Sequence, residues 1–272
     1  MGMADLFMTD LSLGQWILFS LAGLLTGVIN TLAGSGSLIT LPVFIFICGL
    51  PADVANGTNR IGALFQSATG VRAFQKQGEL HLKGIVWIAV PIVLGAALGA
   101  QIAVSLNERM MNYSIAALMV FMLIVLLVNP KQWIRETEAS VQHNKRPLNL
   151  LVFFIIGVYG GFIQAGVGIF LLAGLVLLAR YSLKASNGIK LAVVFLFNIP
   201  AILIFFSMNQ IHFGYGIAMA IFQSVGAYLG VKWISKIPNA NFWIHKLLIL
   251  IVIASALKFL GLYSWIYAQF VA

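Results

Sequence analysis

The chain has 272 residues, of which 61% are hydrophobic and 8% are charged. This composition excludes a soluble globular domain of the same length, because such domains carry about 25% charged residues. The formal net charge of +9 does not indicate nucleic-acid binding, since the basic residues do not cluster on one soluble element. The single cysteine, Cys48, lies in an apolar segment, so we interpret it as a packing residue rather than a redox site.

Hydrophobic segments follow one another along the chain, and several approach the roughly 20 residues that cross a ~30 Å hydrocarbon core. The N-terminal residues include Asp5 and Asp10 but no Lys or Arg, so we do not expect the first segment to be a cleavable signal peptide. We therefore predict an all-α polytopic membrane protein. The predicted segments are 13–33, 37–50, 60–74, 84–105, 110–128, 149–165, 168–180, 187–207, 213–234 and 243–266.

Residues 31–42, TLAGSGSLITLP, interrupt this apolar sequence. Glycine costs about 1 kcal/mol in a helix interior and proline about 3 kcal/mol, and a lipid-exposed break leaves backbone polar groups unsatisfied. We therefore expect the break at Gly34–Ser37 to be buried in protein or to face water. Segments 37–50 and 168–180 are short for a full crossing, which predicts interrupted or re-entrant helices.

The second half of the chain repeats features of the first. Residues 78–101 align with 209–232 at a constant spacing of 131, which sets His81 on His212 and matches two glycine pairs. The same spacing sets Asn56-Gly57 on Asn187-Gly188, and one residue more sets the glycines of 34–36 on those of 166–168. We predict a first repeat at 1–128, a cytoplasmic loop at 129–148 and a second repeat at 149–272.

An odd number of about five helical segments in each repeat gives the two halves opposite orientations in the membrane. Inverted-topology repeats with interrupted helices are typical of secondary transporters, whose sites lie near the membrane midplane. When every segment changes sides, only three basic residues fall outside, namely Arg60, Arg109 and Lys258. By the positive-inside rule, both termini are predicted to be periplasmic. The inner face receives Arg72, Lys76, Lys83, Lys131, Arg135, Lys145, Arg146, Arg180, Lys184, Lys190, Lys232, Lys236 and Lys246.

The inventory of chemical groups argues against an enzyme. The chain has no phosphate-binding glycine motif and no H-E-x-x-H pattern, so we predict neither a cofactor nor a metal, and no direct use of ATP. We expect every carboxylate to fall in a tail or loop, outside the membrane. These carboxylates are Asp5, Asp10, Asp53, Glu79, Glu108, Glu136 and Glu138.

The polar groups expected inside the membrane are neutral hydrogen-bond donors, with Arg60 and Lys190 close by. Donors, cationic side chains and helix N-termini together form anion sites, so we expect an anionic substrate. The glycines of the break can also serve only close helix packing, and the run at Asn56 can also be a plain helix N-cap. The predicted substrate-binding residues are Ser35, Gly36, Ser37, Asn56, Gly57, Thr58, Asn59, Asn187 and Lys190.

His81 and His212 each precede a long segment, where an interfacial or capping role competes with proton transfer. The coupling mechanism stays open. A proton carried by one of these histidines, a Na⁺ ion held by backbone carbonyls, and the membrane potential are the three alternatives.

Two motifs carry a resemblance to a known family. The run G-x-x-N-T-L-A-G-S-G-S-L-I-T-L-P, from Gly27 to Pro42, is followed by G-L-P-A-D-V-A-N-G-T-N, from Gly49 to Asn59, and by a degenerate second copy. This pattern resembles the sulfite exporter TauE/SafE family of bacterial membrane transporters. The resemblance implies an inner-membrane location and transport of sulfite, sulfonates or related organosulfur anions. Val167, Ile169 and Phe170 give the second copy fewer donors than the first.

The sequence therefore predicts a secondary transporter that moves a small sulfur-containing anion by alternating access, one repeat moving against the other. Two other classes stay open, an anion channel and a membrane accessory protein without transport. The expected partners are the organosulfur anion and the lipid bilayer, with no nucleic acid. The oligomeric state is open, and a homodimer is compatible with the sequence.

Overall fold

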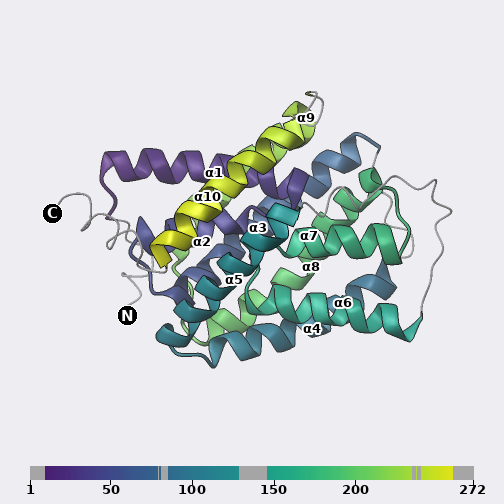
Figure 1. Cartoon of the computed structure of the whole chain (residues 1–272), viewed down its shortest axis with the longest axis horizontal. Helices are drawn as coiled ribbons and strands as arrows, with labels where there is room; N and C mark the ends of the chain where they lie inside the picture. The colour runs from purple at the N-terminus through teal and green to yellow at the C-terminus, as the bar shows by residue number, and fades with distance from the viewer. Residues whose placement is uncertain are drawn as a thin grey trace.

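The computed structural model describes residues 10–78, 80, 85–128, 146–234, 237 and 240–259. These residues form helices and connecting turns, with no strand among them (Figure 1). The elements are α1 (Leu13–Ala33), α2 (Ser37–Phe46), α3 (Ala52–Lys76), α4 (Val86–Val104), α5 (Glu108–Val128), α6 (Pro147–Phe162), α7 (Val167–Ala173), the π-helix η2 (Gly174–Leu178), α8 (Leu183–Ser207), α9 (Phe213–Lys232) and α10 (Ala240–Phe259).

Each predicted hydrophobic segment corresponds to a helix, so the all-α prediction is confirmed. Two helices begin four or more residues earlier than predicted. Helix α3 begins at Ala52, directly after Pro51, and α8 begins at Leu183, where the Ser182 side chain accepts a hydrogen bond from the backbone N–H of Ala185. The polar runs 56–59 and 187–190 therefore lie inside helices, and the run at Asn56 does not form the plain helix N-cap considered above.

Two of the carboxylates expected in loops also lie in helices. Asp53 and Glu108 occupy the first turns of α3 and α5. A carboxylate at a helix N-terminus interacts favourably with the positive end of the helix dipole. Loops were expected at Asp53 and Glu108 because the apolar sequence begins only after these two residues.

Among the described residues, six helices are long and apolar enough to cross a membrane, namely α1, α4, α5, most of α8, α9 and most of α10. The two helices that follow the breaks are much shorter. Helix α2 has 10 residues, which corresponds to about 15 Å and half a hydrocarbon core. Interrupted helices are thus present where the sequence predicted them, and the chain is a multi-pass membrane protein.

Glycines bring two helix pairs into backbone contact. A methyl group added to Gly27 of α1 would lie 2.1 Å from the carbonyl oxygen of Gln223 in α9, and one added to Gly226 would lie 2.1 Å from that of Leu24. The α4–α6 pair is built in the same way, since a methyl group on Gly99 would lie 2.0 Å from the Val158 oxygen. These glycines serve close helix packing, because no side chain larger than hydrogen fits at their positions.

The two glycine-packed pairs flank a centre formed by α3 and α8. In Figure 1, α1 lies along one edge of the molecule, and α4 and α6 lie along the opposite edge. Helix α3 packs against both α8 and α9, while α8 packs against both α3 and α4. Each glycine-packed pair thus joins one helix of 1–128 with one helix of 149–272. The inverted orientation of these halves stays a prediction.

Candidate functional site

The breaks in the two halves meet in the interior of the protein. Gly34 ends α1 in the left-handed conformation with φ +76°, and Gly166 precedes α7 with φ +74°. A methyl group on Gly34 would lie 2.6 Å from the backbone carbon of Gly168, and one on Gly168 would lie 2.4 Å from the Cα atom of Gly34. The two interrupted regions therefore touch backbone to backbone, as glycine alone permits.

Polar side chains from four elements gather around the first break. Between α1 and α3, Asn30 Nδ2 donates to Gln66 Oε1 at 2.5 Å, and Gln66 Nε2 donates to the Thr31 hydroxyl at 3.0 Å. Between α2 and α3, the Thr40 hydroxyl donates to Asn59 Oδ1 at 2.5 Å. We call the following residues the first-break cluster: Thr26, Asn30, Ser35, Thr40, Asn59, Gln66 and Gln223.

Helix α9 contributes Gln223 to this cluster. A methyl group built on Gly62 of α3 would lie 2.9 Å from Gln223 Oε1 and 3.0 Å from Nε2. The carboxamide therefore lies directly against α3. Gly62 is one turn from both Asn59 and Gln66, which places these three positions on one side of the helix.

Three donors of the first-break cluster have no hydrogen-bond partner among the described residues. They are Ser35 Oγ, Asn59 Nδ2 and Gln223 Nε2. Their side chains are at most 1% exposed. Leaving a buried polar group unpaired costs about 1–3 kcal/mol, so these donors are the clearest candidates for contact with a polar ligand.

The two buried cations cap the broken helices in a crossed arrangement. Lys190 of α8 donates from Nζ to the carbonyl oxygens of Asn30 at 3.1 Å and Thr31 at 2.9 Å, near the end of α1. Arg60 of α3 donates from Nη1 to the Gly160 oxygen at 3.2 Å and from Nη2 to the Gly161 oxygen at 2.5 Å, near the end of α6. Each cation thus stabilises the negative end of a helix in the other half.

The prediction that placed Arg60 on the outer face was wrong. Its side chain has no exposed surface, and its guanidinium lies 4.6 Å from the centre of the Phe205 ring. Lys190, which was counted on the inner face, is also buried, with 1% of its surface exposed. Arg60 and Lys190 lie at or near the start of the predicted segments 60–74 and 187–207, so the charge count assigned each to the face on which its segment begins.

Several predicted binding residues are engaged elsewhere. Asn56 Nδ2 donates to the Phe162 carbonyl oxygen at 2.8 Å, at the second break. The Thr58 hydroxyl accepts from the backbone N–H of His212 at 2.9 Å, and a methyl group on Gly57 would lie 2.0 Å from the Gln210 oxygen. The run 56–59 therefore serves three different contacts, and of its members only Asn59 belongs to the first-break cluster.

The remaining predicted residues lie close to the first break. Gly36 packs against α1, where an added methyl group would lie 2.7 Å from the Asn30 Cβ atom, and Ser37 is the buried first residue of α2. Asn187 Oδ1 accepts a hydrogen bond from Lys190 Nζ at 3.2 Å. The structure therefore brings both predicted runs, 35–37 and 187–190, to the end of α1.

His212 is the N-cap of α9, where its Nδ1 accepts from the backbone N–H of Tyr215 at 3.2 Å. This geometry agrees with a capping histidine. His81 lies outside the described residues.

The second break offers a different set of unpaired atoms. Gln164 Oε1 and Asn56 Oδ1 are buried acceptors without partners among the described residues, and Arg60 Nε is an unpaired donor. The Tyr159 hydroxyl donates to the Ala165 carbonyl oxygen. The two breaks are therefore not chemically equivalent, because the neutral unpaired donors gather only at the first.

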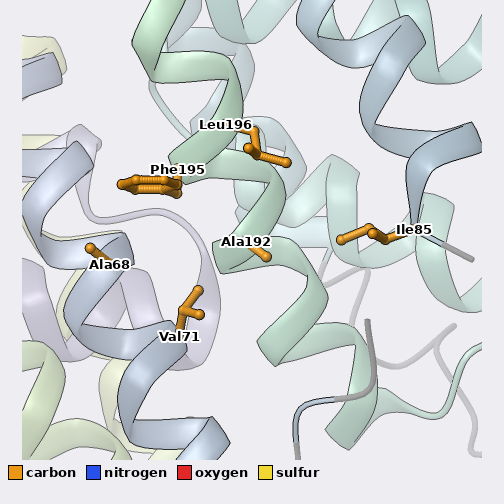
Figure 2. A pocket seen from close by; sticks show the side chains of 6 residues that line it. All are labelled: Ala68, Val71, Ile85, Ala192, Phe195 and Leu196. Carbon is orange, nitrogen blue, oxygen red and sulfur yellow. The ribbon is translucent and has the colours of Figure 1, made fainter. Parts of the chain in front are cut away.

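The cavities of the helix bundle are apolar. One of about 320 Å³ lies between α3 and α8 and is lined by Ala68, Val71, Ile85, Ala192, Phe195 and Leu196 (Figure 2). A second, of about 630 Å³, lies between α4 and α8. Neither of these two cavities includes a residue of the first-break cluster.

Five members of the first-break cluster were not among the predicted binding residues, namely Thr26, Asn30, Thr40, Gln66 and Gln223. Thr26 and Thr40 lie in apolar runs without a motif of their own, and Gln223 is 157 residues from Gln66 in the printed sequence. A signal for Gln223 was present, since Gly226 follows it by three residues and packs against α1. A polar residue one turn from a packing glycine lies on the same buried side.

Comparison with known proteins adds the family. The chain is 26% identical over 254 residues to "Probable membrane transporter protein ORF9" of Sinorhizobium sp, covering 93% of this chain and 95% of that protein. It is 24% identical over 225 residues to a "Probable membrane transporter protein" of Haemophilus influenzae, covering 83% and 87%. No solved structure matches the chain. Residues 19–259 match the family described as Sulfite exporter TauE/SafE, to which this chain therefore belongs.

Proposed function

We propose that the protein is a secondary transporter that carries a small sulfur-containing anion, such as sulfite or a sulfonate like sulfoacetate, by alternating access. The family supports the substrate class. The observation that carries the proposal is the contact of two helix breaks beside three buried, unpaired donors. Broken helices with donors at the centre of a bundle are the usual construction of a transporter site.

The anion would be held at the first break. Ser35 and Asn59 supply donors, and the glycines let the backbone approach the ligand. Lys190 compensates the negative charge from the end of α1, since its Nζ lies against the carbonyl oxygens of Asn30 and Thr31. Asn56 and Thr58, which hydrogen-bond elsewhere, hold the surrounding helices in place.

Alternating access requires two bodies that move relative to each other, and the glycine contacts suggest which helices move together. Backbone-to-backbone packing joins α1 with α9 and α4 with α6. We define the first body as α1, α2, α3 and α9, and the second body as α4, α6, α7 and α8. The proposed motion is therefore between these bodies, with α4 and α9 exchanged between the two halves of the sequence.

Several contacts between the bodies run through side chains that can rearrange, in contrast to the backbone contact of Gly34 with Gly168. A methyl group on Gly70 of α3 would lie 2.5 Å from the Leu191 Cδ1 atom of α8, so this contact runs through a side chain. Lys190 and Arg60 also reach from one body to the other through flexible side chains. Such contacts can repack, whereas the glycine-packed pairs have no side chain to move.

The protein is proposed to lie in a bacterial inner membrane with both termini periplasmic. Removing the two buried cations, Arg60 and Lys190, from the charge count leaves the predicted excess of basic residues on the inner face. The positive-inside rule therefore still favours this orientation. The membrane potential, negative inside, favours anion export without a coupled ion.

Uptake into liposomes tests this function. The purified protein is reconstituted, and entry of sulfite and of sulfoacetate is followed at rising concentration against protein-free liposomes. We expect saturable flux. Flux that stays linear with concentration would identify an anion channel, and absence of flux for every sulfur anion would favour an accessory protein without transport.

A further inference from the structure

We infer that Gln223 of α9 is a substrate ligand, and that it forms with Ser35 and Asn59 a three-donor site for the –SO₃ group of the anion. This inference rests on the proposed function, since it names the residues that would recognise the anion. The inference adds a hydrogen-bond donor from the second half of the sequence to a site whose sequence motif lies in the first half. The site is therefore completed only when both halves fold together.

The packing around Gln223 fixes where its carboxamide can be. The Gln223 backbone is held against α1, because its carbonyl oxygen leaves no room for a methyl group on Gly27. The side chain is held against Gly62 of α3, because a methyl group added to Gly62 would lie 2.9 Å from Oε1 and 3.0 Å from Nε2 of Gln223. The amide thus lies between α1 and α3, the two helices that also carry Asn30 and Gln66 of the first-break cluster.

Gln223 has the properties of a ligand rather than of a structural residue. It is 1% exposed, and its Nε2 has no hydrogen-bond partner among the described residues. A structural glutamine would gain its stability by pairing both ends of the amide. A buried Nε2 atom without a partner among the described residues instead provides a donor for a bound molecule.

Three neutral donors suit a group with three equivalent oxygen atoms. Ser35 contributes a hydroxyl from the break, Asn59 an amide from α3 and Gln223 an amide from α9. A carboxylate has only two oxygen atoms, so two of the three donors would have to share one oxygen atom, whereas an –SO₃ group offers each donor an oxygen of its own. We therefore expect sulfoacetate analogues that keep the carboxylate but lose the sulfonate to bind at least about ten-fold more weakly.

The second break does not offer a matching site. Among the described residues, its neutral unpaired atoms are the acceptor oxygens of Gln164 and Asn56, which repel an anionic oxygen, and its unpaired donor is Nε of Arg60. Asn56 Nδ2 is already bonded to the Phe162 oxygen there. One anion per chain is therefore expected, bound off the centre of the molecule toward α1 and α9.

The test compares Gln223→Met with Gln101→Met in reconstituted uptake of sulfoacetate and in thermal melting of the detergent-solubilised protein. Gln101 is exposed on α4 and serves as the matched control. We expect Gln223→Met to raise the KM at least about ten-fold while the melting temperature stays unchanged or rises, since a buried unpaired amide is removed. Gln101→Met should change neither quantity.

Three outcomes are informative. An unchanged KM for Gln223→Met in a transporting protein would overturn the inference and leave the proposed function intact. A lowered melting temperature with an unchanged KM would show that Gln223 is structural and would also overturn it. If the wild-type protein moves no sulfur anion, the proposed function itself fails.

Discussion

Glycines decide the packing at the scale of single residues. In α1, Gly14 has no neighbouring heavy atom within 4 Å of an added methyl group, whereas Gly27 would place that methyl group 2.1 Å from the Gln223 oxygen. The same residue type in the same helix therefore has two different roles. Only the second position holds α1 against α9.

The difference between these glycines predicts opposite effects of alanine. Gly27→Ala must push α1 away from α9, and we expect a loss of about 1–3 kcal/mol in the free energy of unfolding. Gly14→Ala should leave this free energy unchanged or raise it by up to about 1 kcal/mol, because alanine favours the helix. Thermal melting of the solubilised variants measures both changes. Equal melting temperatures for the two variants would contradict the packing described for Gly27.

The two buried cations give a second prediction. Lys190→Met and Arg60→Met each leave helix-terminal carbonyl groups without a donor, and we expect each to lower the free energy of unfolding by about 1–3 kcal/mol. Only Lys190→Met should also weaken the binding of sulfoacetate, because Lys190 lies beside the first break and Arg60 beside the second. Melting with and without sulfoacetate separates the two effects. The exposed Lys232 provides the control, as Lys232→Met should change neither stability nor binding.

At the scale of elements, the positions of the helix breaks were predictable from the sequence, but the segments that contact each break were not. The run TLAGSGSLITLP predicted the break because glycine and proline disfavour a helix interior. The contact of Gly34 with Gly168 depends on the packing of distant elements, on which a local pattern carries no information. The starts of α3 and α8 were missed because their first turns contain charged residues, Asp53 and Lys184, and so resemble loops in the sequence.

Part of the candidate site was also predictable from the sequence. Ser35 and Asn59 were identified from polar residues next to glycine in an apolar chain, and each is buried with one side-chain atom, Oγ or Nδ2, that has no partner among the described residues. Thr58, one residue from Asn59, points to the backbone of His212 instead. Successive residues of a helix face different directions, so once 56–59 proved helical, its members could not share one ligand.

A prediction at this scale concerns the contact between the breaks. Gly34 and Gly49 both have left-handed backbones, with φ +76° and +68°, but only Gly34 has a neighbour that an added methyl group would strike. Gly49→Ala should therefore cost about 1–2 kcal/mol of backbone strain, and Gly34→Ala should cost this strain plus the separation of the two breaks. We expect sulfoacetate uptake to survive Gly49→Ala and to be lost in Gly34→Ala. Equal uptake by the two variants would show that the contact with Gly168 is not needed.

At the scale of the whole molecule, the two halves are interleaved. Helices α4 and α9 pack against the other half through backbone contacts, so the proposed moving bodies differ from the sequence repeats 1–128 and 149–272. Within the first body, a methyl group on Gly216 of α9 would lie 3.3 Å from the Ile61 Cβ atom of α3. Between the bodies, Gly70 of α3 faces Leu191 of α8.

Disulfides at these two places test the motion in a Cys48→Ala background, which removes the single native cysteine. The pair Ile61→Cys/Gly216→Cys joins helices of one body and should leave uptake unchanged. The pair Gly70→Cys/Leu191→Cys joins the two bodies and should stop uptake until a reductant restores it, since the Leu191 side chain lies directly against Gly70. Uptake that continues with the Gly70–Leu191 positions cross-linked would contradict the proposed bodies.

Counterflow tests the central claim of a carrier most directly. Liposomes that contain the protein are loaded with unlabelled sulfoacetate and diluted into a trace of labelled sulfoacetate. An alternating-access carrier predicts a transient accumulation of label above its external concentration, which Gln223→Met weakens and Gln101→Met preserves. Label that only approaches equilibrium, in proteoliposomes that pass sulfoacetate freely, would contradict a carrier and identify a channel.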